Sequence, residues 1–444
     1  MSAPDPRRVL VLDGQTNQAL ACVRSLGRAG YTVFLASRYR WPLSRWSRFV
    51  SGHHRLGGET LEAFAGLRDA AVAWGVGTVL PLTERACVLC NDQREEWKSA
   101  GVVVGCATDD MLSLAFDKTR TIEIAQMCGV NVPRTIVPSS IADVREAAET
   151  LVFPCIVKAR SSHFWTGSSF ISDLGPRYVA RPADLESVVL GARQGHHWPL
   201  IQEVVPGVGK GAFALFDHGT PVAWFAHERL RDVRPSGAGS SLRRSVALDA
   251  RLRAPAERLL RAMRWHGPAM VEFRDDGTTE PWLMEVNGRF WGSLQLAIAA
   301  GVDFPRLWMD VLHGRPVGVA QPYAEDVTLR WVWGDAKRLL TIARGRPRGY
   351  VGAYPTLRQG LYEVFGPQPR GTRSETWESA DPWPAVGEWV QGVGELRLRR
   401  AALHAALRST VPPPPHGARS ERHGRTRSRD GVLRSPRTPE SSRV

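Results

Sequence analysis

Lysine is scarce in this chain of 444 residues. Only five of its 58 basic residues are lysines: Lys98, Lys118, Lys158, Lys210 and Lys337. Lysine is a compact point charge whereas arginine is a wide planar fork, so each retained lysine raises the question of why arginine would not serve. Cysteine is also sparse, because six residues in this length do not make a disulfide framework. Free thiols and a cytoplasmic location are therefore expected.

Long apolar runs are absent as well. No stretch approaches the roughly 20 residues that cross a bilayer. The N-terminus runs directly into the strand-like segment 9–13, with no secretory signal before it. We therefore expect no membrane partner. Hydrophobic residues make up 43% of the chain, which allows buried cores and excludes wholesale disorder.

The net charge of +14 is unevenly distributed. Residues 416–444 hold eight arginines against three acidic residues, and the rest of the charge is dispersed. Because this segment follows the prolines of 411–415 and has no aromatic residue, a disordered basic tail is predicted over 411–444. A nucleic-acid-binding protein is the alternative from another class. The missing aromatics and the dispersed charge of the body argue against nucleic acid as a partner.

Residues 1–115 are predicted to form a small doubly wound α/β domain. A strand at 9–13, a helix from Ala19 to Ala29 and a strand at 32–36 make a βαβ unit, and buried strands follow at 78–82 and 102–105. The turn after the first strand lacks the GxGxxG pattern that dinucleotides require, so NAD or FAD is not expected there.

From residue 116 the pattern changes to helices alternating with hairpins. Helices are predicted at 117–128, 140–151 and 249–264. Strands are predicted near 154–159, 200–205, 212–216 and 222–227, followed by a hairpin over 270–287. Residues 320–408 are less legible and end in a predicted helix, 384–408. The domain boundaries that follow are 1–115, 116–315, an accessory region 316–410, and the tail 411–444.

The hairpin carries the strongest local signal for chemistry. Its turn is marked by Asp275, Asp276 and Gly277, and a symmetric register places Glu272 opposite Glu285. Two facing carboxylates among apolar neighbours need a counter-charge, which a divalent cation supplies. Asn287 lies on the same face, and this all-oxygen set suits Mg²⁺. Arg289 follows at the next alternate position and could hold a phosphate; solvated glutamates on a surface hairpin are the other interpretation.

Two lysines occupy positions suited to phosphate. Lys118 begins a helix, and Lys158 ends an otherwise apolar strand, where burial is costly unless an anion meets the charge. The loop 161–169 is small and polar, so its backbone amides could also contact phosphates. It is not a P-loop, because GxxxxGK[ST] occurs nowhere in the chain. For either lysine alone, a side chain that reaches water is the competing interpretation.

Several segments in fixed order resemble the ATP-grasp superfamily, most closely its carbamoyl-phosphate-synthase-like and carboxylate–amine-ligase-like members. They are FDKTRTIEIAQMCGVNVPRT (116–135), FPCIVKA (153–159), LIQEVVPGVGKG (200–211), HERLRDVRPSGAGS (227–240), MVEF (270–273) and MEVNGRFWGSLQLA (284–297). The resemblance covers about residues 116–315 and implies a two-lobed α+β ATP-grasp domain. The first block resembles the Rossmann-like pre-ATP-grasp domain that precedes it in such proteins.

The resemblance also implies roles for individual residues. Lys118 and Lys158 would contact ATP phosphates under the loop 161–169, and Arg289 would touch the transferred phosphoryl group. Arg229 and Arg231, taken as alternate positions on one strand face, could bind phosphate or a substrate carboxylate. The remaining implied contacts are Ser161, Gly167 and Ser168 in the loop, Gln202, Glu203 and Val205 at the hinge beside adenine, and Glu272, Glu285 and Asn287 around Mg²⁺ or Mn²⁺.

Three positions depart from the family pattern. The loop has a single glycine, Gly167, where many relatives have several, and Gly288 stands where proline is common. Gly209 and Lys210 lie where many relatives place an acidic residue for ribose, so no ribose contact is assigned.

The implied function is an ATP-dependent carboxylate–amine ligase that forms an acyl phosphate and releases ADP and phosphate. Its partners would be small-molecule carboxylates and amines, and a homodimer is compatible with the sequence. The alternative is an ATP-binding carbamoyl-phosphate-synthase-like, carboxylase-like or regulatory protein without amide ligase activity.

The remaining polar candidates are weaker. Thr83 and Glu84 follow the strand 78–82, either beside a carboxylate pocket between the first two blocks or as a helix cap. Cys87 and Cys90 are expected to be core thiols rather than zinc ligands. The pairs His53–His54 and His196–His197 are expected in exposed loops.

Overall fold

The structure is a computed structural model that describes residues 4–172, 175–318 and 322–409. The described residues divide into two units, one that ends at Glu395 and one that begins at Leu396, and the boundary falls within helix α14 (Trp383–Ser409). The predicted basic tail, 411–444, lies outside the described residues. None of the described helices combines the length and the hydropathy needed to cross a membrane.

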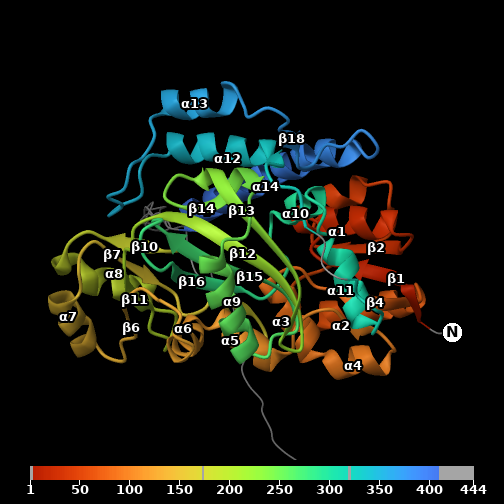
Figure 1. Ribbon diagram of the computed structural model, residues 1–444, viewed down its shortest axis with the longest axis horizontal. Helices are drawn as coiled ribbons and strands as arrows, with labels where there is room; N and C mark the ends of the chain where they lie inside the picture. Colours follow the sequence, from red (N-terminus) through yellow and green to blue (C-terminus); the bar gives the residue numbers. More distant parts are fainter. Residues whose placement is uncertain (1–3, 173–174, 319–321, 410–444) are drawn as a thin grey trace, which may run out of the picture. The chain divides into compact units, whose positions relative to one another are not determined.

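A parallel five-stranded sheet, in the order β3-β2-β1-β4-β5, organises the first 115 residues and is coloured red to orange in Figure 1. This order confirms the predicted doubly wound α/β domain. The βαβ unit arises because the apolar faces of β1 and β2 are covered by a helix whose first turn is capped by the Thr16 hydroxyl. Its elements are β1 (Asp5–Val11), α1 (Asn17–Arg28), β2 (Thr32–Ser37), η1 (Leu43–Trp46), β3 (Val50–Arg55), α2 (Leu61–Ala73), β4 (Val76–Leu80), α3 (Glu84–Asp92), α4 (Arg94–Ser99), β5 (Val103–Val104) and α5 (Asp109–Phe116).

The expectation that His53 and His54 lie in an exposed loop was wrong. Both belong to β3, and both are partly buried. The segment VSGHHR has little apolar character to predict a strand, and it becomes one because it pairs in parallel with β2 at the sheet edge. His196 and His197 are exposed, as expected.

A small antiparallel sheet, in the order β10-β7-β11-β6, forms the first ATP-grasp-like lobe. Its own apolar cluster lies between the sheet and two helices, α7 and α8. The segment 161–169, expected as a loop, contains strand β8 and the turn that joins it to β9, with which β8 pairs as a two-stranded hairpin. The elements are α6 (Lys118–Met127), β6 (Thr135–Ile136), α7 (Ile141–Thr150), β7 (Cys155–Lys158), β8 (His163–Trp165), β9 (Phe170–Ser172), β10 (Arg177–Val179), η2 (Pro182–Asp184), α8 (Leu185–Ala192) and β11 (Leu200–Glu203).

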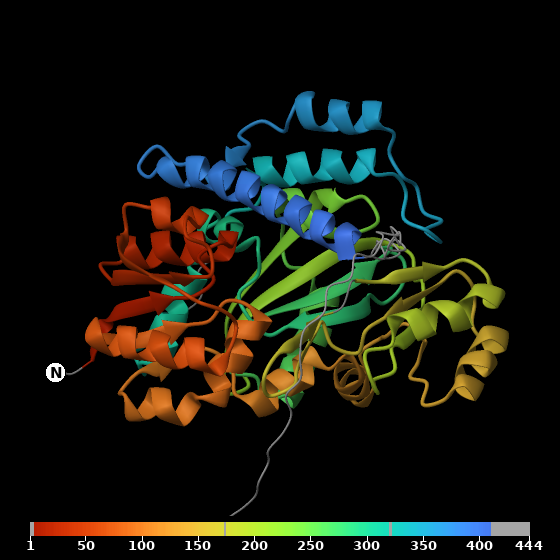
Figure 2. The same cartoon turned by 180° about the vertical axis from the view of Figure 1, so that it is seen from behind.

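A seven-stranded sheet, in the order β16-β15-β12-β13-β14-β17-β18, follows (Figure 2). Successive residues of its long strands point to opposite faces of the sheet. Buried apolar side chains of β12 and β15 therefore contribute to two large apolar clusters, one on each face. The elements are β12 (Val208–Asp217), β13 (Thr220–Arg234), β14 (Ala238–Ser245), α9 (Ala250–Ala262), β15 (Gly267–Asp275), β16 (Trp282–Asn287), α10 (Leu294–Ala299), α11 (Phe304–Leu312), β17 (Thr328–Arg330) and β18 (Arg373–Ser374).

The accessory region adds helices to this sheet. Helix α12 (Val332–Ala343) packs on β13 and β14, and α13 (Leu357–Phe365) packs on α12, as both ribbon views show. The buried pair of Arg24 on α1 with Asp381, whose side chains are 0% and 1% exposed, ties the segment before α14 to the first block. The accessory region, late in the sequence, is thereby held against both the seven-stranded sheet and the first block.

Candidate active site

The hairpin β15–β16 has the predicted register. Glu272 and Glu285 are directly opposite each other on adjacent antiparallel strands, and the turn begins after Asp275. A register shift next to this pair leaves Met284 as an extra residue, with Phe273 opposite Leu283. The two carboxylates therefore project from one face of the sheet.

The two glutamates differ in their electrostatic surroundings. Burial raises the pKa of Glu272, and Glu285 adds to this while the nearby Arg229 opposes it. Burial acts in the same direction on Glu285, but Lys118, the Asn287 amide and Lys158 together lower the pKa of that carboxyl below its usual value. The two carboxyls of the pair therefore have pKa values shifted in opposite directions.

Basic and amide groups surround the carboxylates on the same sheet. Arg229 on β13 forms an ion pair with Glu272 at 2.8 Å. The Asn287 Nδ2 donates to Glu285 Oε1 at 3.0 Å, while Asn287 Oδ1 accepts from Arg289 at 3.1 Å. Gly209 keeps this corner open, because a Cβ there would lie 3.1 Å from the Arg229 guanidinium. The structure brings Arg229, Arg289 and the three predicted metal ligands into one cluster.

Arg231 does not join this cluster. The prediction that it shares a face with Arg229 was wrong, because the register of β13 against β14 shifts on both sides of Arg231. Its guanidinium turns toward α12 and pairs with Asp335 at 2.9 Å, where both side chains are at most 6% exposed. Arg231 therefore holds the accessory region against the sheet.

One cavity, of about 450 Å³, lies beside the carboxylates, and we call it the lysine cavity. Lys118 and Lys158 line it together with Glu203 and Val205, as does Glu285. Burial lowers the pKa of Lys158 to about 8, and Glu285 opposes that shift. A compact cation at this place fits an anionic ligand.

Gln202 does not line the lysine cavity but contacts Lys158, which does. It is 3% exposed, and its Oε1 accepts from Lys158 Nζ at 2.8 Å, while its Nε2 donates to the Thr135 hydroxyl at 2.8 Å. The neighbouring Glu203 and Val205, by contrast, are in the cavity wall. Gln202 therefore positions the lysine.

Of the predicted phosphate loop, 161–169, Ser162 lines the lysine cavity, whereas the three residues expected to contact phosphate do not. Gly167 and Ser168 are exposed at the tip of the β8–β9 hairpin, and Gly167 has a positive φ of 88° in that turn. The Ser161 hydroxyl is buried and donates to the His163 carbonyl at 2.9 Å, so it is the adjacent Ser162 that lines the cavity. These three residues do not meet the lysines in this structure.

A second cavity of about 450 Å³ lies on the other side of the Arg229–Glu272 pair. We call it the tryptophan cavity, because Trp291, Trp331 and Trp333 line it. Arg229 and Glu272 belong to the walls of both cavities. Its other charged and amide-bearing residues are Gln15, Asn17, Gln18, His227, Arg243, Asn287, Arg289, Lys337, Glu388, Gln391 and Glu395.

Many residues that line the two cavities were not predicted from the sequence. Tyr350, Val351 and Gly352, which follow α12, line the lysine cavity, and α14 supplies Glu388, Gln391 and Glu395 to the tryptophan cavity. Tryptophan clustering between 331 and 389 was the available signal, but it carries no spacing rule.

The first block contributes to the tryptophan cavity through residues 15–18, at the β1–α1 turn, rather than through Thr83 and Glu84. The Thr83 hydroxyl caps α3, although Glu84 approaches Arg289 at 3.6 Å. Cys87 and Cys90 are buried free thiols in the core, as predicted.

Gly288 has a structural reason to be glycine. A Cβ at this position would lie 2.5 Å from the Trp265 ring and 3.2 Å from Leu112. The departure from the common proline therefore follows from close packing beneath the Asn287–Arg289 segment.

The donor set at the hairpin fits a hard divalent cation. Two carboxylates face each other, and the Asn287 amide can present its oxygen toward them by a half-turn of its terminal group. A cation between the two facing carboxylates would also reduce their mutual repulsion. Glu272, Glu285 and Asn287 are thus suitable ligands for Mg²⁺.

Comparisons with known proteins place this geometry in a family context. The family model described as "ATP-grasp in the biosynthetic pathway with Ter operon" matches residues 222–334. A D-alanine–D-alanine ligase from Stutzerimonas stutzeri is 30% identical over 216 residues, which are 45% of this chain and 65% of that protein. The chain thus spans slightly less than two thirds of this relative.

Solved structures share the fold at low sequence identity. The biotin carboxylase domain of Hydrogenobacter thermophilus 2-oxoglutarate carboxylase, a dimer in complex with MgADP, ADP and bicarbonate, gives a TM-score of 0.59 at 14% identity and covers 72% of this chain and 73% of its own. An L-amino acid ligase from Bacillus licheniformis gives 0.51 at 17% identity, covering 69% and 74%. At such identities the likeness concerns the fold alone.

Proposed function

The chain belongs to the ATP-grasp superfamily, and from this premise we propose that it is an ATP-dependent ligase that joins a carboxylic acid to an amine. The observation that carries the proposal is the pair of cavities that share Arg229 and Glu272 as a common wall. A phosphoryl group held at that wall lies between a nucleotide on one side and an acceptor on the other.

The lysine cavity is proposed as the ATP site. Lys118 and Lys158 would neutralise the phosphates, with Lys158 oriented by Gln202, and Glu203 and Val205 would lie beside the base. Glu272, Glu285 and Asn287 would hold Mg²⁺, or Mn²⁺ in its place, which neutralises charge on the transferred phosphoryl group. The hairpin tip at Gly167 and Ser168 would reach the phosphates only if β8–β9 moves toward the lysines.

The tryptophan cavity is proposed to hold the acid and the amine. Arg289 and Arg229 lie at its end nearest the carboxylates, where they can bind the acid bidentately. A carboxylate oxygen then attacks the γ-phosphorus of ATP, which forms an acyl phosphate and releases ADP. The amine attacks the carbonyl carbon, and phosphate and one proton leave as the amide forms. Residues of both charge signs in this cavity suit substrates that bear carboxylate and amine groups.

The curated relatives support this choice among ATP-grasp activities. The matching proteins are named D-alanine–D-alanine ligases, and a ligase of that kind joins an acid to an amine. One of the similar folds is named an L-amino acid ligase. Our proposal extends this class of reaction, but not those particular amino acids, to the present chain. It also includes the expectations of a cytoplasmic enzyme, small-molecule partners and a homodimer.

Replacing Glu285 by glutamine tests the proposed metal site. The variant keeps the shape of the side chain but removes the ionised carboxylate, so ADP formation with pooled acids and amines should fall by about a hundredfold or more. The measurement is ADP and AMP release by the full chain at saturating Mg²⁺. Glu280→Gln, at the exposed end of the same hairpin, is the matched control.

Activity of Glu285→Gln near that of the parent chain would remove Glu285 from the metal site. ADP release that depends on bicarbonate and not on an amine would instead favour the carboxylase-like alternative. ATP binding without turnover in any pool would favour a regulatory protein.

A further inference from the structure

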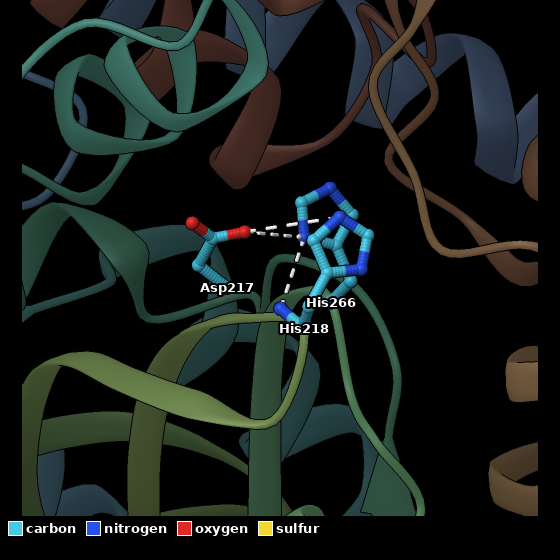
Figure 3. A group of neighbouring side chains, drawn as sticks. All are labelled: Asp217, His218 and His266. Atoms are coloured by element: carbon cyan, nitrogen blue, oxygen red, sulfur yellow. Dashed lines mark hydrogen bonds and ion pairs between the residues drawn. The ribbon is translucent and has the colours of Figure 1, made fainter.

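Three side chains meet at a corner of the seven-stranded sheet, away from the two cavities. Asp217 ends β12, His218 begins the turn into β13, and His266 precedes β15 (Figure 3). Asp217 Oδ1 lies 3.2 Å from His266 Nδ1 and 3.9 Å from His218 Nε2. The three potential ligand atoms lie within 4.8 Å of one another, as no other such group of His, Cys, Asp and Glu does among the described residues.

A tight turn places His218 beside the end of β12. Asp217 pairs with Thr220, so His218 and Gly219 form a two-residue hairpin turn, with φ values of 43° and 84°. Positive φ at both central positions is typical of the type I′ turn, for which Asn-Gly is the preferred sequence. Histidine is, with asparagine and aspartate, among the non-glycine residues that adopt a positive φ most often. The turn therefore accommodates His218 and brings its imidazole within 3.9 Å of Asp217.

The second histidine is held firmly in place. The His266 ring is 20% exposed and meets the edge of Trp308 with ring centroids 5.0 Å apart. The backbone amide of Gly219 donates to the Trp265 carbonyl at 2.7 Å, which fixes the turn beside the corner.

We propose that Asp217, His218 and His266 form a binding site for a borderline transition-metal ion of the zinc class. Two imidazole nitrogens and one carboxylate oxygen are a donor set that zinc accepts, with water completing the coordination at an exposed site. The same set is poor for Mg²⁺, which prefers oxygen ligands. The site would pin the β12–β13 turn to the start of β15.

The present ring arrangement sets one condition for binding. The His218 and His266 rings are stacked, with centroids 4.0 Å apart and planes at 10°, so both cannot direct a lone pair at one ion. His218 is 70% exposed and can rotate out of the stack. Arg261, which donates to the Gly219 carbonyl, is paired with Glu257, so its charge is compensated.

Zinc binding by the full chain is the test. The chain is dialysed against zinc chloride with excess magnesium chloride, bound metal is measured by atomic spectroscopy, and cobalt(II) substitution reports ligation through its visible absorption. We expect one zinc per chain. His218→Asn keeps a residue that the turn prefers, and His266→Gln removes the buried ligand. Each should weaken zinc binding by roughly tenfold or more.

His196→Asn and His197→Asn are matched controls, because they alter an exposed histidine pair elsewhere. These two variants should bind zinc like the parent chain. The proposal is overturned if the parent binds no zinc, if it binds adventitious zinc only without a defined cobalt spectrum, or if His218→Asn and His266→Gln bind as tightly as the parent. Loss of binding in the control variants would also overturn it.

Discussion

At the scale of single residues, the scarce lysines were informative but not decisive. Lys118 and Lys158 line the lysine cavity, as their positions at a helix start and a strand end suggested. Lys210 instead pairs with Asp275 at 2.7 Å, and Lys337 lies in the wall of the tryptophan cavity, 4.0 Å from Glu395. The scarcity of lysine therefore does not identify the lysines of the lysine cavity, whereas their positions at a helix start and a strand end do.

Glu388 is a second residue whose chemistry depends on long-range contacts. It is 3% exposed in the wall of the tryptophan cavity, where Trp331 donates to one carboxyl oxygen and Thr376 to the other. Burial raises the pKa of Glu388 to about 7, although these two donors oppose the shift. No sequence pattern around Glu388 signals this environment, because the partners lie on other elements.

The raised pKa of Glu388 predicts a pH-dependent effect on stability. In the folded state the carboxyl keeps its proton up to about pH 7, whereas an unfolded glutamate loses it near pH 4.5. The folded state therefore binds more protons between these values, so the contribution of Glu388 to stability decreases as pH rises through this window and levels off above it. Because glutamine does not titrate, Glu388→Gln should remove this decrease in stability with rising pH.

Urea unfolding at pH 5 and pH 8 measures this effect. Between the two pH values, Glu388→Gln should gain about 2.5 kcal/mol in free energy of unfolding relative to the parent. Glu280→Gln controls for the loss of one exposed carboxylate. An equal pH dependence in Glu388→Gln and the parent would mean that the carboxyl titrates normally.

At the scale of elements, alternation predicted the hairpin β15–β16 but failed on β13. The pairing of Glu272 with Glu285 followed from assuming a symmetric register about the midpoint of the hairpin, and the bulge at Met284 lies on the turn side of the pair without changing it. The register shifts around Arg231 could not be read from the sequence, because a bulge leaves no residue type that marks it. The prediction that both arginines face the carboxylates was therefore correct for Arg229 and wrong for Arg231.

Methionine substitutions at these two arginines should separate their roles. Arg231→Met leaves Asp335 buried with Arg330 as its remaining partner, so the free energy of unfolding should fall by about 3 kcal/mol. Arg229→Met should instead abolish ADP formation with a smaller loss of stability, because Arg229 lies at the proposed transfer point. Urea unfolding and ADP release are measured for both variants. Loss of turnover at unchanged stability in Arg231→Met would contradict this division.

At the scale of the whole molecule, the parallel sheet and the lobes around the hairpin could be predicted because their signals are local. The arrangement of the accessory region could not be predicted, because it depends on contacts with α1, β13 and β14, which are distant in the sequence. The tryptophan cavity joins residues 15–18 to residues 388–395, and no local pattern links such distant segments. The sequence thus pointed to several residues of the lysine cavity and to few residues of the tryptophan cavity.

The central claim is that the chain activates a carboxylate by phosphorylation, and a hydroxylamine trap tests it most directly. The full chain is incubated with Mg²⁺, ATP and pools of carboxylic acids, and hydroxamate, ADP and AMP are quantified together. The account predicts hydroxamate with an equal amount of ADP, because hydroxylamine captures the acyl phosphate. Hydroxamate with AMP would mean adenylation and would contradict the proposed mechanism.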